Sequence, residues 1–259
     1  MKRLSTETGE MATDEWIERL IELESDVRYQ EYASTDEPEY LYVAGTLPVL
    51  VSAPHGAVHT RDGGAAVKIT AKEEDEYTAG LARLLGSRTG AYVIYARRKS
   101  RTDPNADVEA PYKQVLLQIA RENGICFVLD LHGAKKEQDF GVALGTVHGA
   151  SCSVQQKQII VRTFRTYGIS EAGSGLARLD VDQRFPGKGD ERRQPVVKFC
   201  QSHSLPAAQI EINAWLRIPL RRADATSPDK DFKGDPGLIR NLVEALSEVV
   251  ISIANQCPQ

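Results

Sequence analysis

Three apolar segments of the chain end in side chains that can do chemistry, and these segments are Leu47–Gly56, Cys126–Leu131 and Ala207–Ile212. The first presents His55 beside a glycine, the second is followed by His132, and the third carries Glu211. Buried strands of open α/β proteins place reactive groups at the carboxyl edge of their sheet. We therefore expect His55, His132 and Glu211 to share one cleft.

The two strand-end histidines predict a metal site, because neutral imidazole is a common zinc ligand; ordinary hydrogen-bonded core histidines are the alternative. A catalytic zinc ion uses about three protein ligands and keeps an open position, so one ligand is still needed. The acidic run Glu73–Glu76 follows the His55 loop and can supply it. We choose Asp75, with Glu74 and Glu76 as alternatives. The other acids of this run are expected only to complement the dipole of a helix that begins there.

Glu211 is flanked by Ile210 and Ile212 inside an apolar strand. An ionised carboxylate is costly to bury in such a strand unless it is paired, protonated or close to a metal. We interpret Glu211 as the general base of a metal-dependent hydrolysis. A structural ion pair with an arginine is the alternative.

A basic loop follows the predicted strand Ala91–Ala96 and contains Arg101 and Asn105. A guanidinium group beside a carboxamide can bind a carboxylate or a developing oxyanion. The turn around Pro104 fixes the backbone next to Arg101, which favours this residue over Arg98. We therefore expect Arg101 and Asn105 to contact the substrate.

Strands that alternate with helices predict an α/β fold with three α/β/α layers around a central mixed sheet. The predicted strands are Tyr40–Ala44, Leu47–Ala53, Ala91–Ala96, Cys126–Leu131, Phe140–Val147, Leu176–Val181 and Ala207–Ile212. The predicted helices are Asp14–Asp26, a helix from Glu73 to Gly86 or Gly90, Tyr112–Glu122, Val154–Tyr167, Pro195–Ser202 and Leu238–Ile253. Only Gly45 and Thr46 separate the first two strands, which predicts a hairpin. We expect an irregular segment after His55 and an exposed loop over Arg217–Gly237.

The composition suits one domain that spans residues 1–259, with residues 1–12 frayed, since 41% of the 259 residues are hydrophobic. The net charge of −4 comes from interspersed acids and bases, which argues against nucleic acid or an anionic membrane as the partner. No run reaches the roughly 20 apolar residues that span a bilayer, and the N-terminal segment lacks the apolar core of a signal peptide. We therefore expect a cytoplasmic protein. We also expect its four scattered cysteines to be reduced, and these are Cys126, Cys152, Cys200 and Cys257.

The motifs SAPHG, SRTDPN, DLHG and QIEIN occur in this order between residues 47 and 217, and together they resemble the N-formylglutamate amidohydrolase family of the zinc-carboxypeptidase-like superfamily. The resemblance implies a phosphorylase/hydrolase-like fold and hydrolysis of an amide bond near a carboxylate. It implies one zinc ion per chain, held by His55, Asp75 and His132. It also implies that Glu211 and Arg101 are catalytic. The substrate contacts that we assign are Arg101, Asn105 and Asn213.

Two alternatives to this kind of amidohydrolase remain. One is another carboxypeptidase-like hydrolase that cleaves a γ-glutamyl or peptide-like bond. The other is a non-catalytic relative that binds a carboxylate in the same cleft. The chain contains metal ligands, a base and an anion-binding arginine together, which favours an enzyme. In each case the expected partner is a small molecule that bears a carboxylate.

Overall fold

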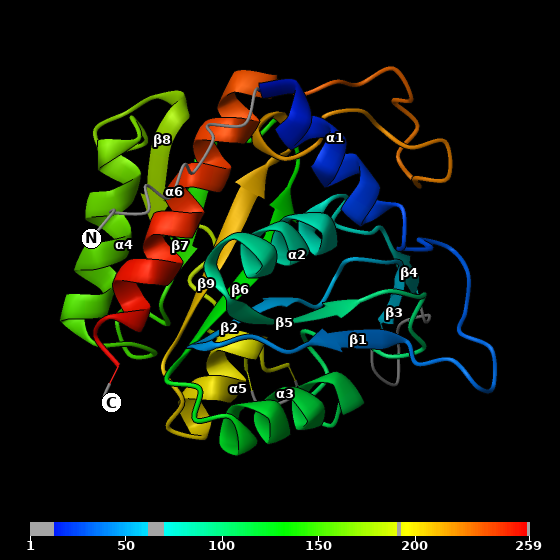
Figure 1. Cartoon of the computed structure of the whole chain (residues 1–259), viewed down its shortest axis with the longest axis horizontal. Coiled ribbons are helices and arrows are strands. Elements are labelled where there is room, and N and C mark those ends of the chain that lie inside the picture. Colours follow the sequence, from blue (N-terminus) through cyan, green and yellow to red (C-terminus); the bar gives the residue numbers. More distant parts are fainter. Residues whose placement is uncertain (1–12, 62–69, 191–192, 258–259) are drawn as a thin grey trace, which may run out of the picture.

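A seven-stranded sheet runs through the centre of the molecule (Figure 1). The computed structural model describes residues 13–61, 70–190 and 193–257, so the fraying predicted for residues 1–12 lies outside the described residues. The strands of the sheet are β1 (Tyr40–Val43), β2 (Leu47–Ala53), β5 (Ala91–Ala96), β6 (Phe127–Ala134), β7 (Phe140–Gly145), β8 (Gly175–Val181) and β9 (Ala207–Asn213). Two shorter strands, β3 (His59–Arg61) and β4 (Thr70–Lys72), form a separate antiparallel ribbon.

The helices lie outside the sheet. They are α1 (Thr13–Glu24), α2 (Thr78–Thr89), α3 (Pro111–Glu122), α4 (Val154–Thr166), α5 (Val196–Ser202) and α6 (Pro236–Ala254), with a short 3-10 helix, η1 (Ala214–Leu216), directly after β9. Within the residues that the structure describes, none of these helices combines the length and the apolar character needed to cross a membrane.

The strand order in the sheet is β1-β5-β2-β6-β9-β7-β8. β5, β2, β6 and β9 are parallel to one another, whereas β1, β7 and β8 run in the opposite direction. The sheet is therefore mixed, as predicted, and β6 is its central strand. The carboxyl ends of β2, β6 and β9 lie at the same edge of the sheet, where open α/β folds typically build their sites.

Helices cover both faces of the sheet (Figure 1). α1, α2, α4 and α6 gather on one side, where Leu20, Leu81 and Leu242 are fully buried in the larger core cluster. α3 and α5 cover the opposite face, where Leu116 and Val196 are buried in a second cluster. The three-layer α/β/α fold predicted from the alternation of strands and helices is confirmed.

The hairpin predicted between the first two strands is wrong. β1 pairs antiparallel with β5, and β2 pairs parallel with β5 on its other side. The connection between β1 and β2 crosses the start of β5, where the amide of Thr46 donates to the carbonyl of Gly90. A Cβ atom on Gly45 would lie 2.4 Å from that same carbonyl oxygen. The glycine is therefore needed for a close crossing of two chain segments and not for a tight turn.

The sequence predicts that α2 begins at Glu73, but the helix begins at Thr78. Tyr77 has a left-handed backbone conformation with φ 64°, which separates the acidic run from the helix. Glu73–Glu76 is therefore a non-helical segment, and its side chains do not form a first helical turn. The helix ends before Gly90, one of the two predicted positions, where φ is 83°.

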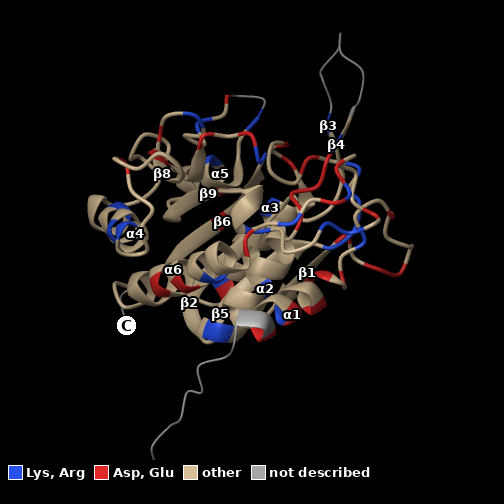
Figure 2. Ribbon diagram, turned by 90° about the horizontal axis from the view of Figure 1, so that it is seen from above, with Lys and Arg blue, Asp and Glu red and all other residues tan. Residues whose placement is uncertain are grey.

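The segment after His55 contains regular structure that the sequence does not predict, because it includes the strands β3 and β4. β3 also contacts the basic loop that follows β5. The amide of Ser100 donates to the carbonyl of Val58, and the amide of Thr60 donates to the carbonyl of Ser100, both at 3.0 Å. Figure 2 shows the ribbon beside loops in which acidic and basic residues gather.

Two of the cysteines differ from the predicted reduced state. The sulfur atoms of Cys126 and Cys257 form a disulfide, with Cα atoms 5.9 Å apart. This separation lies in the usual range for a disulfide. Cys126 precedes β6 and Cys257 follows α6, and no sequence pattern predicts that these two positions meet. Cys152 and Cys200 are free, as expected.

Candidate metal centre

The side chains of His55, Asp75 and His132 converge at the carboxyl edge of the sheet. Nδ1 of His132 lies 3.3 Å from Oδ2 of Asp75, and Nδ1 of His55 lies 3.5 Å from the same oxygen. The possible ligand atoms of the three residues all lie within 4.8 Å of one another, and both histidines are buried. The structure thus brings together the three residues that the sequence predicts as metal ligands.

Two neighbouring strands and one loop position these residues. His55 follows β2, and His132 lies near the end of β6, which pairs with β2 in parallel. Asp75 reaches both histidines because its own amide donates to the carbonyl of His55 at 2.8 Å. This hydrogen bond ties the segment before α2 to the end of β2.

The two acids beside Asp75 are engaged elsewhere. Glu74 accepts hydrogen bonds from the amide and the hydroxyl of Thr226, at 2.7 and 2.9 Å. Glu76 forms an ion pair of 2.8 Å with Arg221. Both are therefore held by the loop that follows η1, while the residue between them faces the histidines. Of the three acids considered from the sequence, Asp75 is the one that the structure places at the cluster.

Each histidine is held from behind by a second carboxylate. Nε2 of His55 lies 2.9 Å from Oδ1 of Asp103, and Nε2 of His132 lies 3.0 Å from Oδ2 of Asp130. Asp103 and Asp130 are fully buried. Metal-binding histidines typically donate their second ring N–H to such a group, which fixes the tautomer and leaves the other nitrogen for the metal. The arrangement leaves both Nδ1 atoms to face Asp75.

The two supporting carboxylates were missed at the level of the sequence. Asp130 lies two residues before His132 on the same face of β6, so strand periodicity could have pointed to it. Asp103 offers no such signal, because it lies 48 residues from His55 in a loop. Its neighbour Pro104 indicates a turn but says nothing of a distant histidine.

Burial and mutual contacts set the charges of the cluster. Burial raises the pKa of Asp75, but hydrogen bonds with His132 and His55 outweigh it and hold that pKa well below its usual range. Burial lowers the pKa of His132, but Asp130 and Asp75 outweigh this effect, so the pKa is raised well above its usual value. In the absence of a metal, Asp75 is therefore an anion and His132 is protonated at physiological pH, and binding of a metal would release the proton from Nδ1 of His132.

Glu211 lies beside His132. The two residues are direct neighbours across β9 and β6, and side chains in register on parallel strands point to the same face. Glu211 is buried, and its Oε1 accepts a hydrogen bond from Nε2 of Gln209 at 2.8 Å. Burial raises the pKa of Glu211 to about 7, although His132 offsets part of this effect. A carboxyl group with this pKa can exchange a proton near neutral pH, as a general base must.

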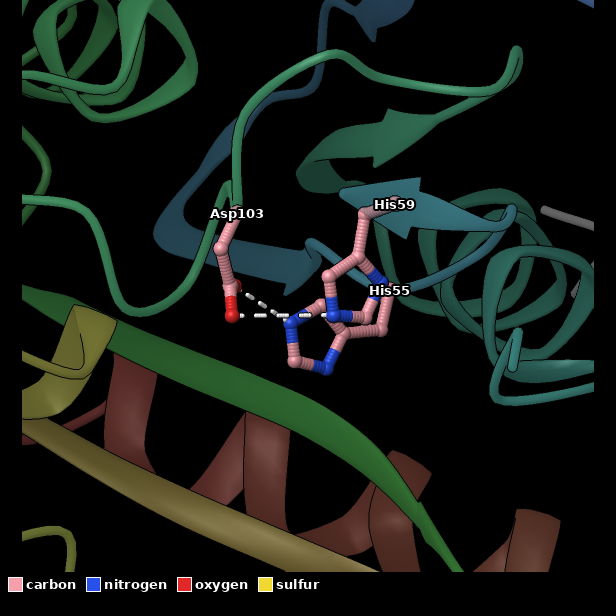
Figure 3. A group of neighbouring side chains, drawn as sticks. All are labelled: His55, His59 and Asp103. Atoms are coloured by element: carbon pink, nitrogen blue, oxygen red, sulfur yellow. Dashed lines mark hydrogen bonds and ion pairs between the residues drawn. The ribbon is translucent and has the colours of Figure 1, made fainter. Parts of the chain in front are cut away.

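A third histidine, His59, is buried beside the cluster (Figure 3). Its ring stacks on that of His55, with the centroids 4.0 Å apart, and its Nε2 lies 3.6 Å from Oδ2 of Asp103. Among the described residues, neither of its ring nitrogens has a hydrogen-bond partner. Burial, together with His55, lowers the pKa of His59 to about 3, so the ring is neutral. His55, His59 and Asp103 form a second group that could hold a cation. Nε2 of His55, however, is already bonded to Asp103.

A cleft of about 680 Å³ opens in front of the cluster. The β3–β4 ribbon, the acidic run before α2 and the loops after β6 and η1 form its walls. Its cationic lining residues are Arg61, Lys72, Lys135, Lys136, Arg217 and Arg221. Acidic side chains line it as well, so the cleft presents both signs of charge to a ligand.

The segment Arg217–Gly237 is not simply the exposed loop that the sequence predicts. Arg217 is 5% exposed, and its guanidinium donates to the carbonyls of Ile212 at 3.1 Å and Ala134 at 3.3 Å. A Cβ atom on Gly133 would lie 2.6 Å from this guanidinium. A side chain at position 133 of the DLHG motif would therefore displace the guanidinium of Arg217 from its place against β6.

Three residues predicted to contact the substrate lie elsewhere. The guanidinium of Arg101 lies over the ring of Tyr32, 4.5 Å from its centroid, and the residue is exposed. Oδ1 of Asn105 accepts a hydrogen bond from the amide of Val196 at the start of α5. Asn213 is fully buried, and its amide group is bonded to backbone atoms at both ends. None of these three side chains lines the described cleft, which is lined by His55 and Asp75 but not by His132 or Glu211.

The donor set at the cluster fits a zinc ion. Two imidazole nitrogens and one carboxylate oxygen are the ligands that zinc takes in catalytic sites with three protein ligands. Here they are close together, largely buried and supported by carboxylates on the far side of both rings. We therefore regard His55, Asp75 and His132 as the candidate metal centre.

No protein-family model matches the chain, and no curated protein matches its sequence. Solved structures do have similar folds. The N-formylglutamate amidohydrolase from Ralstonia eutropha JMP134 has a TM-score of 0.52 and 17% identity, over 85% of this chain and 98% of that chain. A bacteriophage poly-gamma-glutamate hydrolase has a TM-score of 0.49 and 16% identity, over 86% of this chain and 93% of that chain. A metallo-carboxypeptidase from Pseudomonas aeruginosa has a TM-score of 0.48 and 13% identity, over 94% and 69%.

The likeness to the Ralstonia structure concerns the fold, because the sequences are only 17% identical. It extends over almost all of that protein and most of this one. The structure of this chain therefore has the fold that the resemblance of its motifs to the N-formylglutamate amidohydrolase family implies.

Proposed function

We propose that this protein is a zinc-dependent hydrolase that cleaves the amide bond of an N-acyl amino acid such as N-formylglutamate. The main support is the convergence of His55, Asp75 and His132 on one point, with Glu211 beside it. The resemblance of the sequence motifs supports an amide bond as the target. The fold shared with an N-formylglutamate amidohydrolase is compatible with this activity.

In this proposal, His55, Asp75 and His132 hold one zinc ion per chain. When bound in such a site, zinc acts as a Lewis acid that polarises a carbonyl oxygen and lowers the pKa of water. Asp103 and Asp130 orient the two imidazole rings and make their Nδ1 atoms better donors.

Glu211 is the proposed general base. Its carboxylate lies next to His132, and its pKa of about 7 suits a group that takes a proton from water and later gives it to the leaving amine. Gln209 holds one oxygen of this carboxylate, which leaves the other oxygen for the proton.

The size of the cleft favours a second candidate, a hydrolase that acts on a γ-glutamyl or peptide-like bond. The volume of about 680 Å³ lies in the range of pockets that enclose drug-sized molecules, which are larger than N-formylglutamate. The same ligands and the same base would serve either reaction. The two candidates therefore differ in what fills the outer part of the cleft.

Metal analysis followed by a substrate screen tests the proposal. Protein purified without chelator is expected to contain about one zinc ion per chain. It should release glutamate from N-formyl- or N-acetyl-L-glutamate, whereas turnover of γ-glutamyl dipeptides alone would favour the second candidate. Zinc-loaded protein that cleaves neither class would contradict both candidates and favour a non-catalytic carboxylate-binding protein.

A further inference from the structure

The β3–β4 ribbon presents one face to the cleft. His59 and Arg61 are two positions apart in β3, so their side chains point to the same side of the ribbon. Lys72 lies directly opposite His59 in β4. All three residues line the cleft. In addition to the buried His59, this wall of the cleft carries two cationic side chains, Arg61 and Lys72.

Asp103 fixes Arg61 next to the candidate metal centre. One carboxylate oxygen of Asp103 is bonded to Nε2 of His55 at 2.9 Å, and the other accepts from Nε of Arg61 at 2.7 Å. Figure 3 shows Asp103 reaching the histidine side of this bridge. Asp103 is fully buried, and its Oδ1 also accepts from the amides of Asn105 and Ala106. Asp103 therefore links the guanidinium of Arg61 directly to His55, a candidate metal ligand.

Within the part of the chain that the structure describes, Arg61 donates only from its Nε, to Asp103, and its two terminal amino groups have no protein partner there. Its side chain is 29% exposed. The other arginines that line the cleft differ. Arg217 uses its three guanidinium nitrogens on backbone carbonyls, and Arg221 is bound to Glu76 and Ser227.

We propose that Arg61 binds a carboxylate of the substrate through its two terminal amino groups. This assignment rests on the proposed function, which requires a carboxylate near the scissile amide. A guanidinium held by Nε at one carboxylate can still bind a second carboxylate bidentately through Nη1 and Nη2. The role expected from the sequence for Arg101 thus belongs to Arg61, and Lys72 adds positive charge on the same wall.

Calorimetric titration of the zinc-loaded protein with glutarate tests the assignment, because glutarate has two carboxylates and no amide bond to cleave. Arg61→Ala should weaken glutarate binding by about 10- to 100-fold, the size expected for losing hydrogen bonds to a charged group. Arg61→Lys should lie in between, since it keeps the charge but loses the planar fork. Arg101→Ala is the matched control and should bind as wild type does.

Glutaramide, the neutral analogue, and zinc content are measured in the same variants. The assignment holds if Arg61→Ala leaves glutaramide binding and zinc content unchanged. It is overturned if glutarate binding is unchanged, if glutaramide binding weakens equally, or if Arg61→Ala loses zinc, which would make Arg61 a structural support of Asp103.

The result can be separated from the proposed function, because binding of glutarate requires no turnover. An inactive protein whose glutarate affinity depends on Arg61 would contradict the hydrolase and keep the assignment. An active enzyme whose glutarate affinity does not depend on Arg61 would support the hydrolase and contradict the assignment of Arg61. If the protein takes up no zinc, the same comparison is made on the protein as isolated.

Discussion

The candidate metal centre with Glu211, here called the metal side, and the wall of the cleft that carries Arg61, here called the arginine side, are built in different ways. On the metal side, His132 and Glu211 lie in β6 and β9, and the pairing register of these strands places them side by side. On the arginine side, Arg61 lies in a short ribbon, and its direction depends on Asp103, which is 42 residues away in the chain. A sheet positions side chains through local periodicity, whereas a ribbon or loop relies on contacts between distant segments.

Asp75 combines the two kinds of construction. It lies in a loop, yet it contributes to the metal side because its amide is bonded to the carbonyl of His55. The next turn is held by Glu24, a fully buried residue of α1 that accepts hydrogen bonds from the amides of Tyr77 at 3.0 Å and Gly80 at 2.6 Å. A loop can therefore be held in place by hydrogen bonds from its neighbours to a buried carboxyl group.

Removal of a strand-end ligand should have the largest effect. His132→Ala takes away one of three donors, so zinc content should fall close to zero in elemental analysis. Losing several kcal/mol of transition-state stabilisation should lower turnover by about 10³-fold or more. His203→Ala is the matched control, because His203 is exposed and packs on Phe199. Normal zinc content in His132→Ala would remove His132 from the metal side.

Glu211→Gln separates the base from the ligands. It keeps the shape of the side chain but removes the basic oxygen, so turnover should fall by about 10²- to 10⁴-fold while zinc content stays normal. Steady-state kinetics and elemental analysis measure the two quantities on the same preparation. Glu137→Gln, which changes an exposed acid at the cleft, should leave the rate nearly unchanged. If Glu211→Gln loses zinc instead, the residue is a ligand and not a base.

The fold and the strand-end residues could be predicted because both depend on periodicity. The apolar run Ala91–Ala96 matches β5 residue for residue. The positions of His132 and Glu211 could be predicted from the same periodicity, because a polar residue at the end of a buried strand is expected at the edge of the sheet. The order of the strands was less predictable: the link through Gly45 looks like a turn, but β5 lies between the two strands that it connects.

The contacts of the arginine side could not be predicted for a physical reason. Arg61 and Arg101 both lie in charged segments next to turns, and nothing in their neighbouring residues distinguishes them. The deciding contacts are with Asp103 in one case and with Tyr32 in the other. Asn213 illustrates the same limit, because a carboxamide after a strand can serve the backbone as well as a ligand.

The pH dependence of stability probes the loop that carries Asp75. Burial raises the pKa of Glu24 from its usual 4.5 to about 7, and the hydrogen bond from Tyr29 offsets only part of this. Between these pH values the folded chain keeps a proton that the unfolded chain has lost. The contribution of Glu24 to the free energy of unfolding should therefore fall by about 3 kcal/mol as pH rises from about 4.5 to about 7.

Urea unfolding at several pH values measures this slope. Glu24→Gln should remove the part of the slope that Glu24 contributes and leave the part from Glu211, whose pKa is also raised to about 7, whereas Glu22→Gln, on the exposed side of α1, should retain the full slope. If the slope is the same in both variants, Glu24 is not the buried carboxyl group that stabilises the turn before α2.

The smallest effect is expected from the carboxylate behind a ligand, and it tests how much of the metal side the sheet alone provides. Oδ2 of Asp130 lies 3.0 Å from Nε2 of His132, and its Oδ1 accepts a hydrogen bond from Ser52 at 2.8 Å. Asp130→Asn preserves shape and one acceptor but removes the negative charge that makes the opposite ring nitrogen a stronger donor. We expect zinc affinity to fall by about 10- to 100-fold, as is typical for such partners. Competition with a chelator measures this, and Asp139→Asn, an exposed acid paired with Arg184, is the control. Unchanged affinity in Asp130→Asn would mean that the pairing of β6 with its neighbours positions His132 without help, so that strand register and not the supporting charge accounts for this ligand.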